Sequence, residues 1–164
     1  MSRRATRTGH RNHPPAPSTT TSAPWLWAAA PHAVFPLQET PATPHGKWLW
    51  FLPIRALDAG WRLVKQAVED GKLGPGAKVA TLGSSFEGDP TRRPVIVYTA
   101  DSTDEADVHR VLVALRTLGV NDALAYKTDE ATELGEYGDR TSLYTSPVSS
   151  TKVVHRTPRY AAPT

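Results

Sequence analysis

Positively charged side chains stand near the ends of several predicted strands, and together they have the chemistry to bind a phosphate group. Lys47, Lys78 and Lys127 each begin or end such a strand, and Arg93 and Arg140 each precede one. Cations at strand ends can converge on one side of a sheet, where ammonium and bidentate guanidinium groups bind a phosphate dianion. We expect Lys47, Arg93 and Arg140 to hold phosphate, although any one of them alone is more often a solvated surface charge.

Four aromatic residues near these cations are candidates for ligand contact. In a strand, Trp48 and Trp50 share one face, while Lys47 lies on the other. The two indole rings can stack on a base, or they can pack in the core against a helix, and the sequence leaves both roles open. Tyr126 and Tyr144, in the last two predicted strands, complete the set.

Acid–base and metal chemistry have less support. His109 is the candidate acid or base, but it lies about 130° from the centre of the apolar stripe of its predicted helix, so it should face solvent or a partner. The chain has no cysteine, and no two histidines have ligand spacing on a predicted element, so we expect no metal and no cofactor. Phosphate-loop, dinucleotide-binding, zinc-protease and serine-hydrolase motifs are absent from the sequence.

The elements that must position these side chains predict one α+β domain over residues 46–147. Helices are predicted over 58–70 and from the capping-box residues Ser102 and Glu105 to Gly119, and strands over 47–52, 77–82, 94–99, 123–127 and 141–145, with a turn of helix at 129–134. This order lacks the steady alternation of a doubly wound fold. It predicts a curved, largely antiparallel or mixed sheet with two long helices packed on one face. The other face is then free to be concave and polar.

Both helices show a single apolar stripe. The stripe residues are Leu57, Trp61, Val64 and Val68 in the first helix, and Val108, Val111, Leu112, Leu115 and Leu118 in the second. Asp58 is the predicted N-cap of the first helix, and a capping box at Ser102 and Glu105 is predicted to begin the second.

The two ends of the chain have a different composition. Eight of the 15 prolines fall in residues 1–46, and few large apolar residues lie there outside Trp25, Leu26 and Trp27. Such a segment buries too little surface to offset its ordering entropy, so we predict a disordered arm over 1–45 and a mostly disordered tail over 148–164.

Charge is distributed just as unevenly. Residues 1–46 hold four arginines and one glutamate (4 − 1 = +3), whereas residues 47–164 hold 15 basic and 15 acidic side chains (15 − 15 = 0). Nucleic acid binding through the folded domain is therefore not expected. No apolar run approaches the roughly 20 residues that span a bilayer. We expect a cytoplasmic protein without membrane contact, and the Ala, Arg, Pro and Gly usage hints at a high-GC bacterial source.

Six stretches of the sequence resemble one known family. They are residues 46–52, 58–61, 71–79, 95–101, 104–111 and 126–132. Their order and spacing resemble the family of the basophilic-leukaemia-expressed protein, whose bacterial members carry a phosphothreonine lyase label. The resemblance covers residues 46–147. It implies a fold like that of the mRNA cap-binding translation initiation factor, with a ligand cleft on the concave side of the sheet.

The resemblance also implies a reaction. A phosphothreonine lyase eliminates phosphate after a base, usually a lysine, removes the Cα proton, and here Lys127 or Lys78 is the candidate base. Lys47, Arg93 and Arg140 would hold the dianion. The acid that protonates the leaving phosphate has no good candidate, because His109 faces away and His45 lies at the domain edge.

Three hypotheses follow, and the sequence leaves open whether the protein is an enzyme. The first is a domain that binds a phosphorylated peptide or nucleotide-like ligand, with phosphothreonine lyase activity as an extension. The second is a non-catalytic nucleotide or RNA-end binding module that stacks its ligand on Trp48 or Trp50. The third is a protein-interaction domain with the two tails as tethers.

Overall fold

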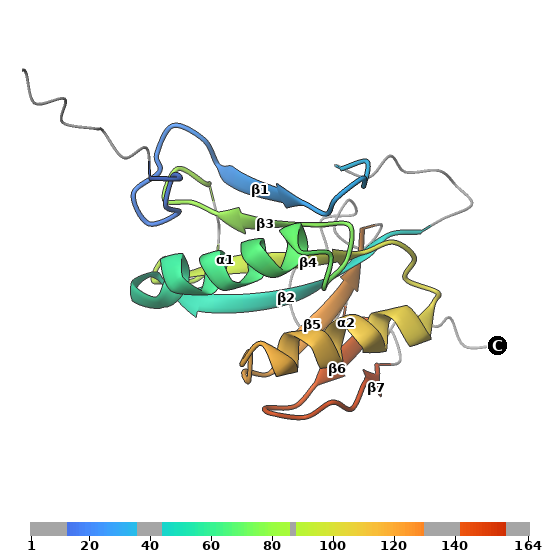
Figure 1. The fold of residues 1–164 in the computed structure, drawn as a ribbon. Helices are drawn as coiled ribbons and strands as arrows, with labels where there is room; N and C mark the ends of the chain where they lie inside the picture. Colours follow the sequence, from blue (N-terminus) through green and yellow to red (C-terminus); the bar gives the residue numbers. More distant parts are fainter. Residues whose placement is uncertain (1–12, 36–43, 86–87, 130–141, 157–164) are drawn as a thin grey trace, which may run out of the picture.

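A seven-stranded sheet organises the residues that this computed structural model describes, which are 13–35, 44–85, 88–129 and 142–156. Its strands are β1 (Trp25–Ala29), β2 (Gly46–Pro53), β3 (Gly76–Ala80), β4 (Arg92–Thr99), β5 (Leu124–Thr128), β6 (Tyr144–Ser146) and β7 (Val154–His155). They lie in the order β1-β3-β4-β2-β5-β6-β7, and every neighbouring pair is antiparallel (Figure 1). The predicted α+β class with a largely antiparallel sheet is confirmed.

Two helices, α1 (Ile54–Glu69) and α2 (Glu105–Thr117), pack on the same face of this sheet (Figure 1). Their predicted stripes are almost wholly buried against Trp48, Val95 and Val97 of the sheet. Burial of a large apolar side chain contributes about 1.5–3 kcal/mol, so this layer holds most of the folding free energy. We call this side of the sheet the covered face and the opposite side the uncovered face.

The start of α1 differs from the prediction. The helix begins directly after Pro53, whose extended backbone ends β2, so Asp58 lies one turn inside the helix and is not its N-cap. The carboxylate of Asp58 instead accepts two hydrogen bonds from Ser18, one from the backbone N–H at 2.9 Å and one from the hydroxyl at 2.5 Å. Ser18, 40 positions earlier in the chain, thus donates to the carboxylate that the sequence predicted to cap the helix.

The start of α2 also differs, by two residues. Asp104 is the N-cap, and its carboxylate accepts a hydrogen bond from the backbone N–H of Asp107 at 3.2 Å. Ser102 is buried, and its N–H donates to Pro44 O at 2.8 Å. The loop before α2 is therefore hydrogen-bonded to the residues that precede β2, and Asp104 rather than Ser102 caps the helix.

The N-terminal segment adds a strand where the sequence predicted a disordered arm. β1 pairs with β3, and Leu26 and Ala28 reach the core of the covered face. Thr81 fastens the chain before β1, because its N–H donates to Pro24 O at 3.0 Å and its hydroxyl donates to Ala23 O. The segment cannot bury a core by itself, but the edge of β3 supplies the backbone partners and the apolar surface that it lacks.

The C-terminal segment is also held to the domain over residues 146–156. β7 pairs with β6, and the guanidinium of Arg116 on α2 donates to Ser150 O at 2.8 Å and to Pro147 O at 2.9 Å. Ordered structure thus extends beyond the predicted boundary at residue 147. The turn predicted over 129–134 lies outside the described residues apart from Asp129. No helix in the described part of the chain is long and apolar enough to cross a bilayer.

Candidate functional site on the uncovered face

The register of the sheet brings three of the five predicted cations to the uncovered face. Directly opposite residues of paired strands share a face, and Lys47 lies opposite both Lys127 on β5 and Tyr98 on β4. Lys78 on β3 lies opposite Trp27 on β1, and its alternation places it on the same side as Lys47. These three lysines therefore lie on one face of the sheet, and their joint role in binding phosphate stays a prediction.

Lys78 lies against two aromatic rings. Its Nζ is 4.0 Å from the ring centroid of Trp25 and 5.0 Å from that of Trp27, which are two residues apart on β1. Burial and, to a smaller extent, the charge of Lys47 lower the pKa of Lys78 to about 8, and the charge of Asp129 partly opposes this shift. The cation–π contacts favour the charged ammonium, whereas burial favours the neutral amine. Lys78 thus loses its proton near pH 8, well below the range of an ordinary lysine.

Lys47 is neutralised within the protein. Its ammonium forms an ion pair of 2.8 Å with the carboxylate of Asp129, and both side chains are largely buried. Like charges directly opposite each other in a sheet repel, so Asp129 offsets part of the cost of placing Lys47 opposite Lys127. Three lysines and one aspartate leave a formal charge of 3 − 1 = +2 on this group when all are ionised.

An aromatic cluster borders the lysines. The ring of Phe35 packs 5.3 Å from the ring of Tyr98 and 5.6 Å from that of Trp27. Phe35 and Trp25 also pack on a small buried cluster of Leu49, Ile96 and Tyr98, which is separate from the main core. Trp27 is 46% exposed, so one indole ring of this face remains open to a ligand. We call Trp25, Trp27, Phe35, Tyr98 and the three lysines the aromatic–lysine face.

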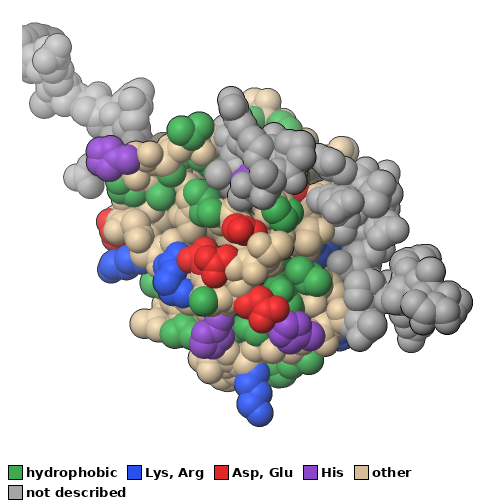
Figure 2. All heavy atoms as spheres, turned by 90° about the vertical axis from the view of Figure 1, so that its right-hand side faces the viewer, with side chains coloured by type: hydrophobic (Ala, Val, Ile, Leu, Met, Phe, Trp, Pro, Cys, Tyr) green, Lys and Arg blue, Asp and Glu red, His purple; other side chains and the backbone are tan. Residues whose placement is uncertain are grey.

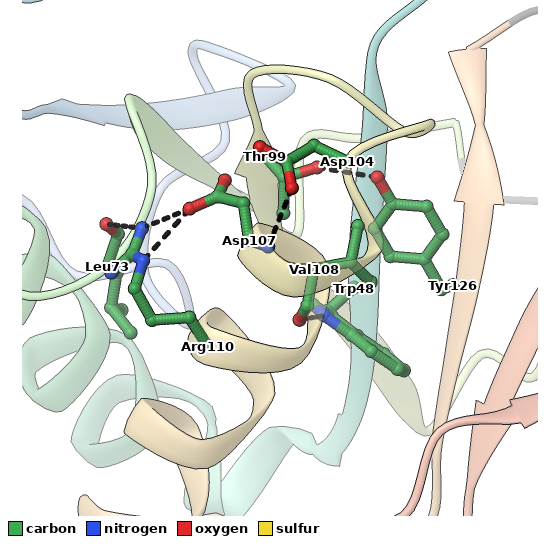
Figure 3. Close-up of polar contacts among 8 residues, drawn as sticks. All are labelled: Trp48, Leu73, Thr99, Asp104, Asp107, Val108, Arg110 and Tyr126. Atoms are coloured by element: carbon green, nitrogen blue, oxygen red, sulfur yellow. Dashed lines mark hydrogen bonds and ion pairs between the residues drawn. The ribbon is translucent and has the colours of Figure 1, made fainter.

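The tryptophans named from the sequence lie on the other side. Trp48 is 1% exposed, and its Nε1–H donates to Val108 O of α2 at 3.1 Å (Figure 3). Trp50 is buried too, and its Nε1–H donates to Asp122 Oδ2 at 2.7 Å. Both rings fill the space between sheet and helices, so of the two roles left open by the sequence the structure assigns core packing, and a ligand on the uncovered face does not reach them.

Tyr126 and Tyr144 likewise face the helices. The Tyr126 hydroxyl lies 2.5 Å from the hydroxyl of Thr99, and its ring packs edge-on against Trp48 (Figure 3). Burial raises the pKa of Tyr126 well above its ordinary value. The Tyr144 hydroxyl donates to Glu105 Oε1 at 3.4 Å. Neither residue shares the aromatic–lysine face. Tyr126 precedes Lys127 in β5 and therefore points to the other side of the sheet, and Tyr144 lies directly opposite Tyr126.

Of the two arginines named from the sequence, Arg93 does not join the lysines either. Arg93 lies opposite Leu52 and is therefore on the covered side, at the far end of β4 from Tyr98. Its guanidinium donates to the backbone oxygens of Pro90 at 2.9 Å and Thr81 at 3.3 Å, so it holds the preceding loop. Arg140 lies outside the described residues, and its predicted role stays a prediction.

His109 and His45, the two histidines considered as acids, each contact a backbone oxygen within the protein. His109 is exposed on α2, as its position on the helix suggested, and its Nε2 lies 3.0 Å from Thr151 O of the C-terminal segment. Figure 2 shows histidine and acidic side chains mixed on one face of the molecule. His45 lies at the same end of the sheet as Lys47, with its Nδ1 2.7 Å from Ala100 O. Within the described ranges, no three His, Asp or Glu side chains gather as metal ligands would.

Sequence reasoning missed the aromatic half of this face. Trp25 and Trp27 were assigned to the arm, and Phe35, Tyr98 and Asp129 were not singled out. One signal was available: the alternation of Trp25 and Trp27 directly after Pro24 is typical of an edge strand. No comparable signal marks Phe35 or Asp129, since both reach the face only through the fold.

A comparison with protein families agrees with the resemblance seen in the sequence. A family model described as basophilic leukemia-expressed protein Bles03 matches residues 28–135, more than half of the chain. Among solved structures, C. elegans eIF4E-3 in complex with the 4E-binding protein Mextli and a cap analog aligns at 23% identity and TM-score 0.44, covering 55% of this chain and 53% of that one. Ascaris suum eIF4E-3 with an m2,2,7G cap aligns at 20% identity and TM-score 0.39, covering 51% and 49%. The chain thus spans about half the length of each.

Proposed function

The chain belongs to the family of basophilic leukemia-expressed protein Bles03, and we propose that its uncovered face binds a small anionic ligand that carries a planar ring, as a nucleotide does. One observation carries this proposal: the ammonium of Lys78 lies against the rings of Trp25 and Trp27, with Lys47 on the same face of the sheet. Aromatic surface for stacking and cations for a phosphate are thus side by side.

The two halves of such a ligand have separate partners. A ring stacked on the exposed indole of Trp27 gains about 1–3 kcal/mol, with little dependence on which base it is. A phosphate near Lys47, Lys78 and Lys127 relieves the repulsion between like charges and forms charge-assisted hydrogen bonds. A ligand with only one half should therefore bind much more weakly than one with both.

Calorimetric titration tests this division. The ligands are a purine nucleoside monophosphate, the matching nucleoside, inorganic phosphate and a phosphothreonine peptide. We expect the nucleotide to bind at least tenfold more tightly than the nucleoside or phosphate alone, and Trp27→Ala to lose most of that gain. Lys65→Met, which removes an exposed lysine on α1, is the matched control for Lys78→Met. If none of these ligands binds at millimolar concentration, the proposal fails; tighter binding of the phosphopeptide would replace the nucleotide with a peptide ligand.

The protonation of Lys78 supplies a second test. A phosphate beside this lysine stabilises its ammonium form and raises its pKa from about 8. Binding at pH 8–9 should then take up a proton, and affinity should fall as the pH rises above 8. Calorimetry in Tris and in HEPES buffers measures the proton uptake from the difference in apparent enthalpy. Lys78→Met should abolish that difference, whereas Lys65→Met should keep it.

The lowered pKa of Lys78 also favours a second candidate, phosphothreonine lyase activity. In this reaction the neutral Lys78 amine takes the Cα proton, the Cβ–O bond breaks, and phosphate leaves with the bonding electrons toward Lys47 and Lys127, giving a dehydrated residue. Mass spectrometry of a phosphothreonine peptide after incubation would detect the loss of phosphoric acid. Elimination at the rate of buffer alone, or an unchanged rate in Lys78→Met and Lys127→Ala, would exclude the reaction and leave the binding proposal intact.

A further inference from the structure

The ring of Phe35 lies over Gly76 within the aromatic–lysine face, and we call the space that this ring occupies the niche. The floor of the niche is Gly76 on β3, where a Cβ would lie 2.6 Å from atoms of the Phe35 ring. The rings of Trp27 and Tyr98 flank it, at centroid distances of 5.6 Å and 5.3 Å from the ring of Phe35. A side chain at position 76 would occupy the same space, so the niche requires a glycine there.

The chain holds Phe35 less firmly than it holds the walls of the niche. Trp27 and Tyr98 belong to hydrogen-bonded strands, whereas Phe35 follows the end of β1 and belongs to no strand. One backbone bond links residues 30–35 to other described residues, from Ala30 N–H to Pro75 O at 3.0 Å, and a second lies within the segment, from Ala33 N–H to Ala30 O at 3.2 Å. The ring is half-buried, and among the described residues its packing against Trp27, Tyr98 and Gly76 is its main contact with the sheet.

We propose that Phe35 is an intramolecular occupant of the ring subsite, and that the planar ring of a bound ligand takes its place. This inference rests on the function proposed above and names where the ring goes: onto Gly76, between Trp27 and Tyr98. Lys47 Nζ lies 5.7 Å from the ring centroid of Tyr98. A phosphate attached to the ligand's ring would therefore meet the lysines at the edge of the niche.

Displacement has a defined effect on affinity. A site that is mostly occupied by its own side chain binds a ligand more weakly in proportion to the fraction of molecules in which it is open. Removal of Phe35 should therefore strengthen binding, by about tenfold if the ring occupies the niche roughly nine-tenths of the time. A purely structural role for Phe35 has the opposite consequence, because loss of its packing loosens the face and weakens binding.

The test compares three variants by calorimetry with a purine nucleoside monophosphate. Phe35→Ala should bind about tenfold more tightly than the wild type, and Gly76→Ala should bind at least tenfold more weakly, since its methyl group fills the floor. Phe51→Ala is the matched control: Phe51 is 39% exposed on the same face but lies opposite Pro94, away from the niche, and its loss should leave affinity unchanged.

Hydrogen exchange of the wild type gives a readout that does not depend on any variant's stability. Saturating nucleotide should increase exchange over residues 30–35, because the ring that anchors them leaves. Nucleotide binding with unchanged or reduced exchange there, or with equal or weaker affinity in Phe35→Ala, would overturn this inference and keep the proposed function. Binding by Phe35→Ala alone would support it, and no binding by either protein would overturn both.

Discussion

The two faces of one sheet each carry a pair of tryptophans, and the pairs have opposite surroundings. Trp48 and Trp50 lie under the helices, where their indole N–H groups are bonded inside the protein. Trp25 and Trp27 lie where none of the described helices covers the sheet, and they contact a lysine. The same residue type at the same spacing thus serves packing on one face and is available for ligand contact on the other, depending on which elements cover it.

The polar groups follow the same division. On the covered face the indoles and Tyr126 have partners inside the protein, and Ser142 Oγ is the one fully buried side-chain polar atom in the described residues that lacks one. On the uncovered face Lys47 forms its ion pair with Asp129 and lies directly opposite Lys127. The covered face therefore has its indole and phenol groups bonded inside the protein, while the uncovered face is the one on which we propose that an anion binds.

The largest expected difference between the faces is the cost of removing a covered tryptophan. Trp48→Ala deletes a fully buried ring together with its hydrogen bond to Val108, so we expect it to lower the free energy of unfolding by about 3–5 kcal/mol. Urea titration followed by circular dichroism measures this. A loss below about 1 kcal/mol would show that the covered face is not the main source of stability.

Next in size is the ion pair of the uncovered face. Asp129→Asn leaves the Lys47 ammonium largely buried, opposite Lys127 and without its carboxylate, so we expect a loss of about 2 kcal/mol, less than for a fully buried pair. Glu69→Gln, which breaks the exposed pair with Lys65, is the control and should cost less than about 0.5 kcal/mol. Equal effects of the two variants would mean that Lys47 is better hydrated than its position indicates.

A smaller effect is expected from pH. An unfolded lysine titrates near pH 10.4, whereas Lys78 in the folded protein titrates near 8. Below pH 8 Lys78 is protonated in both the folded and the unfolded protein, and the folded protein is destabilised by the burial of this charge. Between pH 8 and about 10 the unfolded chain binds more protons, so the free energy of unfolding rises, on the order of 1 kcal/mol after allowance for solvent screening.

Urea titrations from pH 7 to 10 measure this rise as the difference between wild type and Lys78→Met, with Lys65→Met as the control that should retain it. Higher pH is avoided because burial raises the pKa of Tyr98, which makes the folded state lose stability as unfolded tyrosines ionise. A difference that stays flat over this range would place Lys78 in water rather than against the indoles.

The smallest stability effect is expected at Trp27. Nearly half of this side chain is exposed, so Trp27→Ala should lower the free energy of unfolding by less than about 1 kcal/mol, measured under the same urea conditions as Trp48→Ala. A loss as large as that of Trp48→Ala would remove the distinction between the two faces.

Much of the architecture was predictable from the sequence because it depends on periodicity. The apolar stripe of α1 around Trp61 and Val64, and the alternation of Lys47 and Trp48, each follow from residue spacing alone. The cap at Asp58 was wrongly predicted because the partner of its carboxylate, Ser18, comes from a distant segment. Arg93 was wrongly grouped with the lysines. Its place beside a predicted strand did not indicate which face of the sheet its side chain would take.

The sequence by itself determined which residues of each strand and helix share a face, and with them the class of the fold, since side-chain direction repeats with the backbone. Only the tertiary structure decided which face the helices cover, that the proline-rich N-terminal segment pairs with β3, and that Phe35 rests on Gly76. These contacts join residues far apart in the chain, and their free energy comes from surface that exists only once the sheet has assembled.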